Sequence, residues 1–252
     1  HSVSWTSDNF IEVSENRTKE KCLPCHIPKF VQGEKPSPRL ELRDEGIYCV
    51  SCHLIDNKMQ GPYDLLAPPH PTFRNPDYVR SNICGSCHQK TFKEWKATQV
   101  EDTCQDCHMP RKKRRLTQKA GFNLLHKKRW VGDHRFLNGE IKENDVVMES
   151  GWEENFFLIS LKNQTIPHFV PTADNGDPRL YLYIKFFNEA GEEVDNAKEI
   201  IAPQQETALP YNKKIQYRYR LFDKILKAEV ELKYQPAWSK ERTTVRAETV
   251  RR

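Results

Sequence analysis

Four copies of one five-residue pattern, Cys-x-x-Cys-His, recur in the first half of this 252-residue chain and use every cysteine that it has. The pattern places Cys22 and Cys25 before His26, Cys49 and Cys52 before His53, Cys84 and Cys87 before His88, and Cys104 and Cys107 before His108. Because no thiol is left over, these four sites constrain the fold more than any other feature of the sequence.

The spacing within the pattern suits covalent attachment of haem. Two thiols two residues apart can reach the two vinyl groups of one porphyrin, and the following imidazole then comes under the ring as the proximal iron ligand. Paired cysteines also bind structural zinc or form disulfides. Neither alternative requires a histidine after every second cysteine. The pattern therefore predicts four haem c groups, each with its iron, attached through the eight cysteines and ligated by the four adjacent histidines.

The composition agrees with a cofactor-filled interior. Hydrophobic residues make up 37% and charged residues 30% of the chain, with a mean hydropathy of -0.81. Four large apolar macrocycles would supply the packing surface that such a chain lacks. The formal net charge of +5 is offset by the haem propionates. The bulk charge therefore does not indicate binding to nucleic acid.

The cellular compartment follows from the predicted cofactor. Haem attachment of this type occurs on the outer side of the cytoplasmic membrane, which predicts a periplasmic or extracellular protein. The chain begins at His1 without an apolar leader, so we expect an export leader to have been removed. No apolar run approaches the roughly 18 residues needed to cross a bilayer, and no transmembrane segment is expected.

The spacing of the haem motifs predicts an α+β protein whose first domain is packed around haem. Successive first cysteines are separated by 27, 35 and 20 residues, which leaves little polypeptide for each cofactor. Prolines between the motifs break any long helix. We expect residues 1–148 to form a tetrahaem domain of short helices and long loops. The shortest gap predicts that the third and fourth haems are close neighbours.

Strand-like alternation replaces the haem motifs in the second half of the chain. Apolar and polar residues alternate over 180–186, 215–221 and 228–234, with turn residues between these runs. This pattern predicts an antiparallel β-sandwich over residues 149–238. Residues 239–252 are basic and rich in threonine and valine, and they are expected to be a tail or an edge strand.

The distal iron ligands must come from the remaining histidines or from methionine. Five histidines remain for four irons, namely His70, His134, His168, His126 and His1, in the order in which we favour them. His1 is the alternative to His126. The only methionines are Met59, Met109 and Met148; Met109 directly follows a proximal histidine and is expected to pack rather than to bind iron.

Three segments resemble multihaem c-type cytochromes. Residues 104–110 resemble a recurrent Cys-x-x-Cys-His-Met-Pro site, and residues 129–139, which include His134, are similar to a segment that delivers a distal histidine. His168, in Pro-His-Phe-Val-Pro-Thr, resembles the His-x-x-Pro-Thr segment that opens the β-domain of some members. The resemblance implies that His168 ties the β-domain to the haem domain through iron. Two positions depart from the family: Val100 replaces a histidine five residues after Trp95, and Pro167 replaces a glycine.

These features predict an electron carrier rather than an enzyme. Its four haems would be bis-histidine, six-coordinate and low in potential, and its partners would be redox proteins or an extracellular electron acceptor. One alternative is a multihaem enzyme with an open iron that acts on a small nitrogen compound. Another is a subunit of an extracellular cytochrome filament; monomers and closed oligomers remain open as well.

Two further patterns have competing interpretations. The basic run 111–115 is either a solvated loop whose cations pair with haem propionates or a docking site for an anionic redox partner. The predicted compartment argues against nucleic acid. Asn16 and Asn163 begin glycosylation sequons, a pattern that is frequent by chance.

Overall fold

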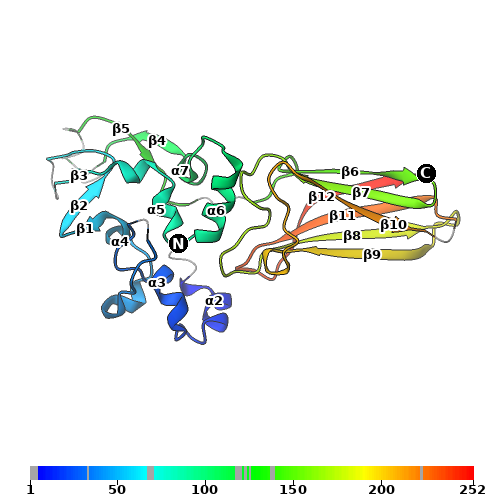
Figure 1. The fold of residues 1–252 in the computed structure, drawn as a ribbon, viewed down its shortest axis with the longest axis horizontal. Helices are drawn as coiled ribbons and strands as arrows, with labels where there is room; N and C mark the ends of the chain where they lie inside the picture. Colours follow the sequence, from blue (N-terminus) through cyan, green and yellow to red (C-terminus); the bar gives the residue numbers. More distant parts are fainter. Residues whose placement is uncertain are drawn as a thin grey trace. The chain divides into compact units, whose positions relative to one another are not determined.

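The structure, a computed structural model, describes residues 5–32, 34–66, 71–116, 121, 124, 126–136, 140–221 and 224–252. The chain divides into two compact units (Figure 1). Unit 1 covers residues 1–92 and 100–139, and unit 2 covers residues 93–99 and 140–252. The division falls within one helix, α6 (Gln89–Thr98).

Unit 1 consists of short elements, as the prolines and closely spaced motifs predict. Its helices are α2 (Asp8–Val13), η1 (Glu20–Cys22), α3 (Leu23–His26), η2 (Leu40–Glu45), α4 (Cys49–His53), η3 (Pro76–Val79), α5 (Asn82–Gly85) and α7 (Cys104–His108). Its strands are β1 (Leu54–Ile55), β2 (Lys58–Gly61), β3 (Phe73–Arg74), β4 (Arg111–Arg114) and β5 (Arg129–Gly132). β1, β2 and β3 form one small sheet, and β4 pairs with β5 in an antiparallel hairpin.

Unit 2 contains two antiparallel sheets of long strands, drawn as the arrows β6 to β12 in Figure 1. The strands are β6 (Val146–Glu153), β7 (Phe156–Asn163), β8 (Arg179–Phe187), β9 (Glu193–Ile201), β10 (Lys214–Arg220), β11 (Lys227–Gln235) and β12 (Thr243–Arg251), with the short helix η5 (Pro203–Gln205). One sheet has the order β10-β7-β6 and the other β12-β11-β8-β9. The predicted α+β class is confirmed, since short helices and several separate sheets coexist.

A single hydrophobic core joins the two sheets of unit 2. Alternate residues of β8 are fully buried, among them Leu182 and Phe186, and they pack in one cluster with Phe157 of β7 and Leu232 of β11. A side-chain period of two points these residues to the same side of their strands. The three alternating runs noted in the sequence all form strands, and residues 243–251 form an edge strand. The position 148/149 lies inside β6, and unit 2 includes residues 140–148.

The apolar core of unit 1 is much smaller. Trp5, Leu23 and Ile27 form its buried cluster, with Phe10 packed against them. In the described parts of the chain, no helix is long and apolar enough to cross a membrane.

Candidate haem-binding sites

Each of the four motifs lies on a single helical turn. The second and fourth coincide with α4 and α7, and the first runs from Cys22, at the end of η1, through α3. The third begins inside α5 at Cys84 and continues into a turn where the His88 amide donates to the Cys84 carbonyl at 3.0 Å. Residues three and four positions apart share one side of a helical turn. Both thiols and the imidazole of each motif are therefore directed to the same side, as attachment to one porphyrin requires.

The residues between the cysteines help to form these turns. In α7 the Thr103 hydroxyl accepts from the Asp106 amide at 3.3 Å, and Asp106 Oδ2 accepts from the Thr103 amide at 3.0 Å. This capping box satisfies two backbone donors at the start of the helix. The hydrogen bonds to Thr103 lower the pKa of Asp106.

The second motif shows the geometry expected of a proximal ligand. His53 Nδ1 lies 2.7 Å from the Gln60 carbonyl oxygen, which can only accept, so Nδ1 carries the proton and Nε2 carries the lone pair. Tyr78 stacks on the imidazole with ring centroids 5.0 Å apart and planes 8° apart, while its hydroxyl donates to the Cys52 carbonyl. Burial raises the pKa of Tyr78 to about 12. The ring of His53 is thus held in both position and tautomer.

The His134 ring lies close to the His53 ring. Their ring centroids are 5.9 Å apart, with planes inclined at 44°. Two imidazoles on opposite sides of one iron, with metal–nitrogen bonds of about 2 Å, have centroids about 6 Å apart. His134 Nδ1 lies 3.0 Å from the Gly132 carbonyl, so this imidazole also carries its lone pair on Nε2. The structure brings together a motif histidine and a predicted distal histidine that are 81 residues apart in sequence.

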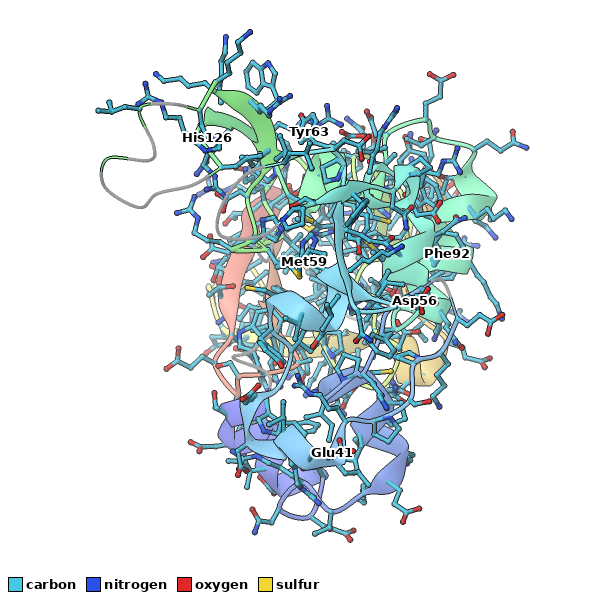
Figure 2. The ribbon with its side chains drawn as sticks, turned by 90° about the vertical axis from the view of Figure 1, so that its left-hand side faces the viewer. Glu41, Asp56, Met59, Tyr63, Phe92 and His126 are labelled. Carbon is cyan, nitrogen blue, oxygen red and sulfur yellow. The ribbon has the colours of Figure 1, made fainter. Side chains whose placement is uncertain are left out.

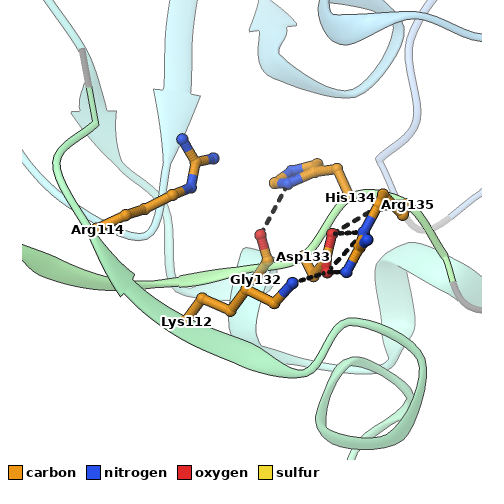
Figure 3. Close-up of a pocket in the computed structure, with 6 residues that line it drawn as sticks. All are labelled: Lys112, Arg114, Gly132, Asp133, His134 and Arg135. Atoms are coloured by element: carbon orange, nitrogen blue, oxygen red, sulfur yellow. Dashed lines mark hydrogen bonds and ion pairs between the residues drawn. The ribbon is translucent and has the colours of Figure 1, made fainter. Parts of the chain in front are cut away.

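An open cleft of about 430 Å³ adjoins His134 (Figure 3) and is lined by Lys112, Arg114, Gly132, Asp133 and Arg135 in addition to the histidine. Asp133 accepts from Lys112 at 2.7 Å and from Arg135 at 2.6 Å, and these hydrogen bonds lower its pKa. Its amide donates to the Pro110 carbonyl at 3.1 Å. Asp133 therefore fastens the segment that carries His134 to the chain that follows the fourth motif.

The first motif is the most buried. Phe10 stacks on His26 with ring centroids 4.0 Å apart, and burial together with the charge of His88 lowers the pKa of His26 to about 4. Among the described residues, His26 Nδ1 is buried and has no hydrogen-bond partner. A neutral imidazole in an apolar setting is the form that binds a metal.

A buried arginine lies between the first and second motifs. Arg39 is only 7% exposed; its amide donates to the Ile27 carbonyl at 2.7 Å, its Nη2 donates to Gly46, and its guanidinium lies 4.1 Å from the Tyr48 ring centroid. Within the described chain its Nε has no hydrogen-bond partner, and Glu45 is 3.8 Å from Nη1. An incompletely paired buried cation beside two attachment sites fits a haem propionate.

The third and fourth motifs lie side by side. The thiols of Cys84 and Cys104 share a hydrogen bond, which raises the pKa of the first and lowers that of the second. The Cys104 amide also donates to the Ser81 hydroxyl at 3.0 Å. Within the third motif, a Cβ at Gly85 would come 2.8 Å from the Phe92 ring, so this position needs glycine. These contacts agree with the predicted closeness of the third and fourth haems.

His168 sits in a loop of unit 2 that is fixed at several points. Its Nδ1 lies 2.9 Å from the Phe169 carbonyl, which again assigns the lone pair to Nε2. The fully buried Asn163 donates to the carbonyls of Ile166 at 2.9 Å and His168 at 2.7 Å. Because this amide is buried and bonded, the Asn163 sequon is not a surface acceptor for a glycan.

A carboxylate holds the other end of the same loop. Glu94 Oε2, on α6, accepts from the Phe169 amide at 3.2 Å and from the Thr172 hydroxyl at 2.7 Å. Val170 exchanges two backbone hydrogen bonds with Leu209. The loop is thus tied on both sides of His168.

The other predicted ligands have less distinctive surroundings. The His126 carbonyl accepts from Arg115 Nε at 3.2 Å, and the residue is half-buried. His1 and His70 lie outside the described residues. Met148 is buried in the core of unit 2, and the Met109 side chain packs beside Gly132, where a Cβ would meet it at 3.2 Å. Met109 therefore packs, as the sequence predicts.

Several residues around these sites could not be identified from the sequence. Gln60, Tyr78, Glu94, Asn163 and Asp133 act through hydrogen bonds or stacking that no sequence motif predicts. For Asp133 a weak signal existed, since it adjoins a histidine within a segment that resembles a distal-ligand segment. Asn163 begins a sequon, which indicates a different role, and the other three gave no local signal.

The residues present fit haem c. None of the eight cysteines, all of them described, is in a disulfide. No group of three or more His, Cys, Asp or Glu side chains in the described parts of the chain could hold a bare metal ion. A haem iron takes four nitrogens from its porphyrin and needs only two ligands from the protein. His53 and His134 could supply two such ligands, and the half-paired Arg39 could provide a cation for a propionate.

Comparisons with known proteins return a multihaem cytochrome among the structural neighbours. A scan against protein-family models and a search of curated proteins both return no match. The fold is similar to that of a penta-haem cytochrome c552 from Thermochromatium tepidum, with a TM-score of 0.55 and 15% identity over 98% of this chain and 83% of the other. A hypothetical protein from Pyrococcus horikoshii has a TM-score of only 0.27 and 13% identity, covering 42% of this chain and 84% of its own. The first likeness shows that the chain has a multihaem-cytochrome fold.

Proposed function

We propose that this chain is an extracytoplasmic electron carrier with four covalently attached haem c groups. One observation carries the proposal: the structure sets the imidazole of a Cys-x-x-Cys-His motif, His53, 5.9 Å from the predicted distal imidazole, His134. The fourfold repetition of the motif extends the argument to three further sites. The penta-haem fold neighbour supports the same class of protein, although the number of haems here rests on the motifs.

The ligands proposed for each iron follow from the motifs and from the fixed loops. The proximal ligands are the four motif histidines, and the cysteines before them form the thioethers. His134 is the distal ligand of the haem bound at His53. His168, in a loop fixed by Asn163 and Glu94, is a second distal ligand. His70, His126 and His1 remain as candidates for the other irons.

A bound haem iron supplies one-electron chemistry, alternating between the ferric and ferrous states. With a motif histidine and a second histidine as its protein ligands, each bound haem would have no free position for a substrate and would be limited to electron transfer. Two imidazoles favour ferric iron more than an imidazole with a thioether, so the potentials should be low. The Cys84–Cys104 contact supports transfer between the third and fourth sites. We propose that unit 2 forms a β-sandwich that presents His168.

The proposal is tested first by the haem content of the holoprotein. Intact-mass spectrometry and the pyridine haemochrome spectrum should give four haems with saturated thioether links. Replacing Cys49 and Cys52 by alanine should remove one of them and leave three. A holoprotein with no covalent haem would overturn the proposal.

The axial pair is tested by substituting the distal residue. His134→Ala should turn one haem in four from low spin to high spin in the ferric electron paramagnetic resonance spectrum. His134→Met is the matched control: it keeps a sixth ligand, so that haem should stay low-spin while its potential rises. His168→Ala should likewise yield one high-spin haem. Wholly low-spin spectra in both alanine variants would show that the distal assignments are wrong.

Two finer predictions from the sequence remain to be tested. An open haem that turns over a small nitrogen compound would show a high-spin ferric signal and cyanide binding at one site in the unmodified protein. Assembly into a filament would be visible by electron microscopy of the purified holoprotein. Particles without fibres under native conditions would count against assembly.

A further inference from the structure

The β4–β5 hairpin concentrates positive charge in a chain that is only mildly basic. The chain has a formal net charge of +5, yet the two strands and their flanks carry eight cations: Arg111, Lys112, Lys113, Arg114, Arg115, Lys127, Lys128 and Arg129. In the described part of the chain, these eight residues form one ion pair, that of Lys112 with Asp133. A concentration of one sign of charge creates a local field that steers oppositely charged molecules.

The strand register assigns these cations to two faces. Lys113 is opposite Trp130, and Lys112 is opposite Val131. Directly opposed residues share a face, and neighbours along a strand alternate. Lys112 and Arg114 line the cleft beside His134 (Figure 3), whereas Lys113 and Trp130 project from the other face. The first face suits the propionates of a bound haem, and the second is left for another ligand.

The outer face combines its cations with an exposed indole. Trp130 is 54% exposed, an unusual position for an indole, and Lys113 beside it is exposed. The half-buried Tyr63 donates to the Trp130 carbonyl at 2.6 Å and so supports this part of the strand. Arg129 lies opposite Arg114, on the inner face. Figure 2 shows Tyr63 and His126 at the hairpin end of unit 1. Tryptophan, tyrosine and arginine are the residues that most often dominate binding energy at protein interfaces.

The position of this face relative to the proposed haem indicates what kind of partner it serves. The inner face of the same hairpin lines the cleft of His134, whose ring is 5.9 Å from that of His53. A molecule docked on the hairpin is therefore next to the proposed second haem. Redox encounters use small interfaces, below about 1,200 Å², and depend on charge complementarity for their association rate.

We propose that the outer face of the β4–β5 hairpin, with Lys113 and Trp130 at its centre, docks an acidic redox protein that exchanges electrons with the haem at His53 and His134. The proposal rests on the electron-carrier function proposed above. The partner's carboxylates would meet Lys113, Lys127 and Lys128, and an apolar rim around its redox centre would meet Trp130.

The test uses the tetrahaem holoprotein and a small acidic flavodoxin, reduced with dithionite, as the probe donor. Reduction of the haems is followed by stopped-flow absorbance over a range of salt concentrations. The double variant Lys113→Glu, Lys128→Glu should lower the second-order rate constant about tenfold or more at low salt, with the difference disappearing near 0.5 M salt. Trp130→Ala should slow the reaction at every salt concentration.

A matched control distinguishes an effect of the local surface on the rate from an effect of the net charge. The double variant Lys213→Glu, Lys240→Glu makes the same charge change at exposed positions of unit 2 and should leave the rate within about twofold. Equal slowing in both double variants, or slowing in neither, would overturn the docking surface.

Two further measurements distinguish failure of the docking surface from failure of electron transfer and from binding to a lipid surface. Reduced methyl viologen, a small cation, should not be slowed by the Lys→Glu changes; if it reduces no haem, the proposed electron-carrier function itself fails. Co-sedimentation with phosphatidylserine vesicles tests a lipid surface as the alternative ligand. Vesicle binding that is lost in Lys113→Glu, Lys128→Glu, with flavodoxin kinetics unchanged, would assign the hairpin to a membrane and refute the proposal.

Discussion

Unit 2 and unit 1 are stabilised in different ways. In unit 2, a continuous cluster of buried side chains from both sheets, such as Phe157 and Leu182, supplies the core. In unit 1, the buried cluster is Trp5, Leu23 and Ile27, although the unit holds every cysteine. Buried apolar area is the main favourable term in folding. From this difference we expect unit 2 to fold on its own side chains and unit 1 to need the proposed haems for a core.

Removal of the haems should have the largest effect, because it should unfold unit 1 and leave unit 2 folded. In the full chain with all eight cysteines changed to alanine, hydrogen exchange should show little protection over residues 5–66 and near-native protection in β7 and β8. The reason is that loss of the macrocycles removes most of the packing surface of unit 1 and none of that of unit 2. The holoprotein is the control. Comparable protection in both units would show that unit 1 has a sufficient core of its own.

A cavity in the core of unit 2 should have the next largest effect. Phe157 is fully buried and makes edge contacts with Trp152 and Phe186. Phe157→Ala should cost about 3–5 kcal/mol in the free energy of unfolding of unit 2, measured by denaturant titration with circular dichroism. The haem absorbance should not change. Phe73→Ala, at a residue 44% exposed in unit 1, is the control and should cost under about 1 kcal/mol.

The loop of His168 is held by side chains of unit 2 but carries a proposed iron ligand. Its conformation depends on the buried hydrogen bonds of Asn163. Asn163→Ala should cost about 2–3 kcal/mol, since the carbonyls of Ile166 and His168 lose their buried donor. It should also give a partial high-spin signal from one haem. Asn196→Ala, at an exposed position of β9, should change neither quantity. Loss of stability without any spectral change would mean that the network serves the fold alone.

The smallest predicted effect is a loss of stability of unit 2 at alkaline pH. Burial and the neighbouring Glu199 raise the pKa of Tyr219, whose hydroxyl donates to that carboxylate at 3.0 Å. Above pH about 10 the unfolded tyrosine ionises while the folded one stays protonated, so stability is full below pH 10 and falls as the pH rises further. Tyr219→Phe should flatten this fall, measured as denaturation midpoints from pH 8 to 11. An unchanged slope would contradict the assignment.

The sequence predicted those strands whose two faces differ in polarity. The runs that became β8, β10 and β11 alternate cleanly because one face of each meets the core. The sequence did not predict β9, because its residues are mostly polar and exposed and show no alternation of apolar and polar residues. β4 consists of Arg-Lys-Lys-Arg and shows no apolar period; only its pairing with β5 makes it a strand. The basic run, for which a solvated loop was one of two interpretations, therefore contributes one strand of a hairpin.

The sequence by itself predicted the chemistry of attachment, because two thiols and one imidazole within five residues are a local requirement that a single helical turn meets. It also named the histidines that are candidates for distal ligands. Only the tertiary structure brought the ring of His134 within 5.9 Å of that of His53, because the two residues are 81 positions apart in sequence. The segment that carries His134 is placed by the β4–β5 hairpin and by the ion pair of Asp133 with Lys112. Partners that are distant in sequence are set by packing and hydrogen bonds that no local pattern encodes.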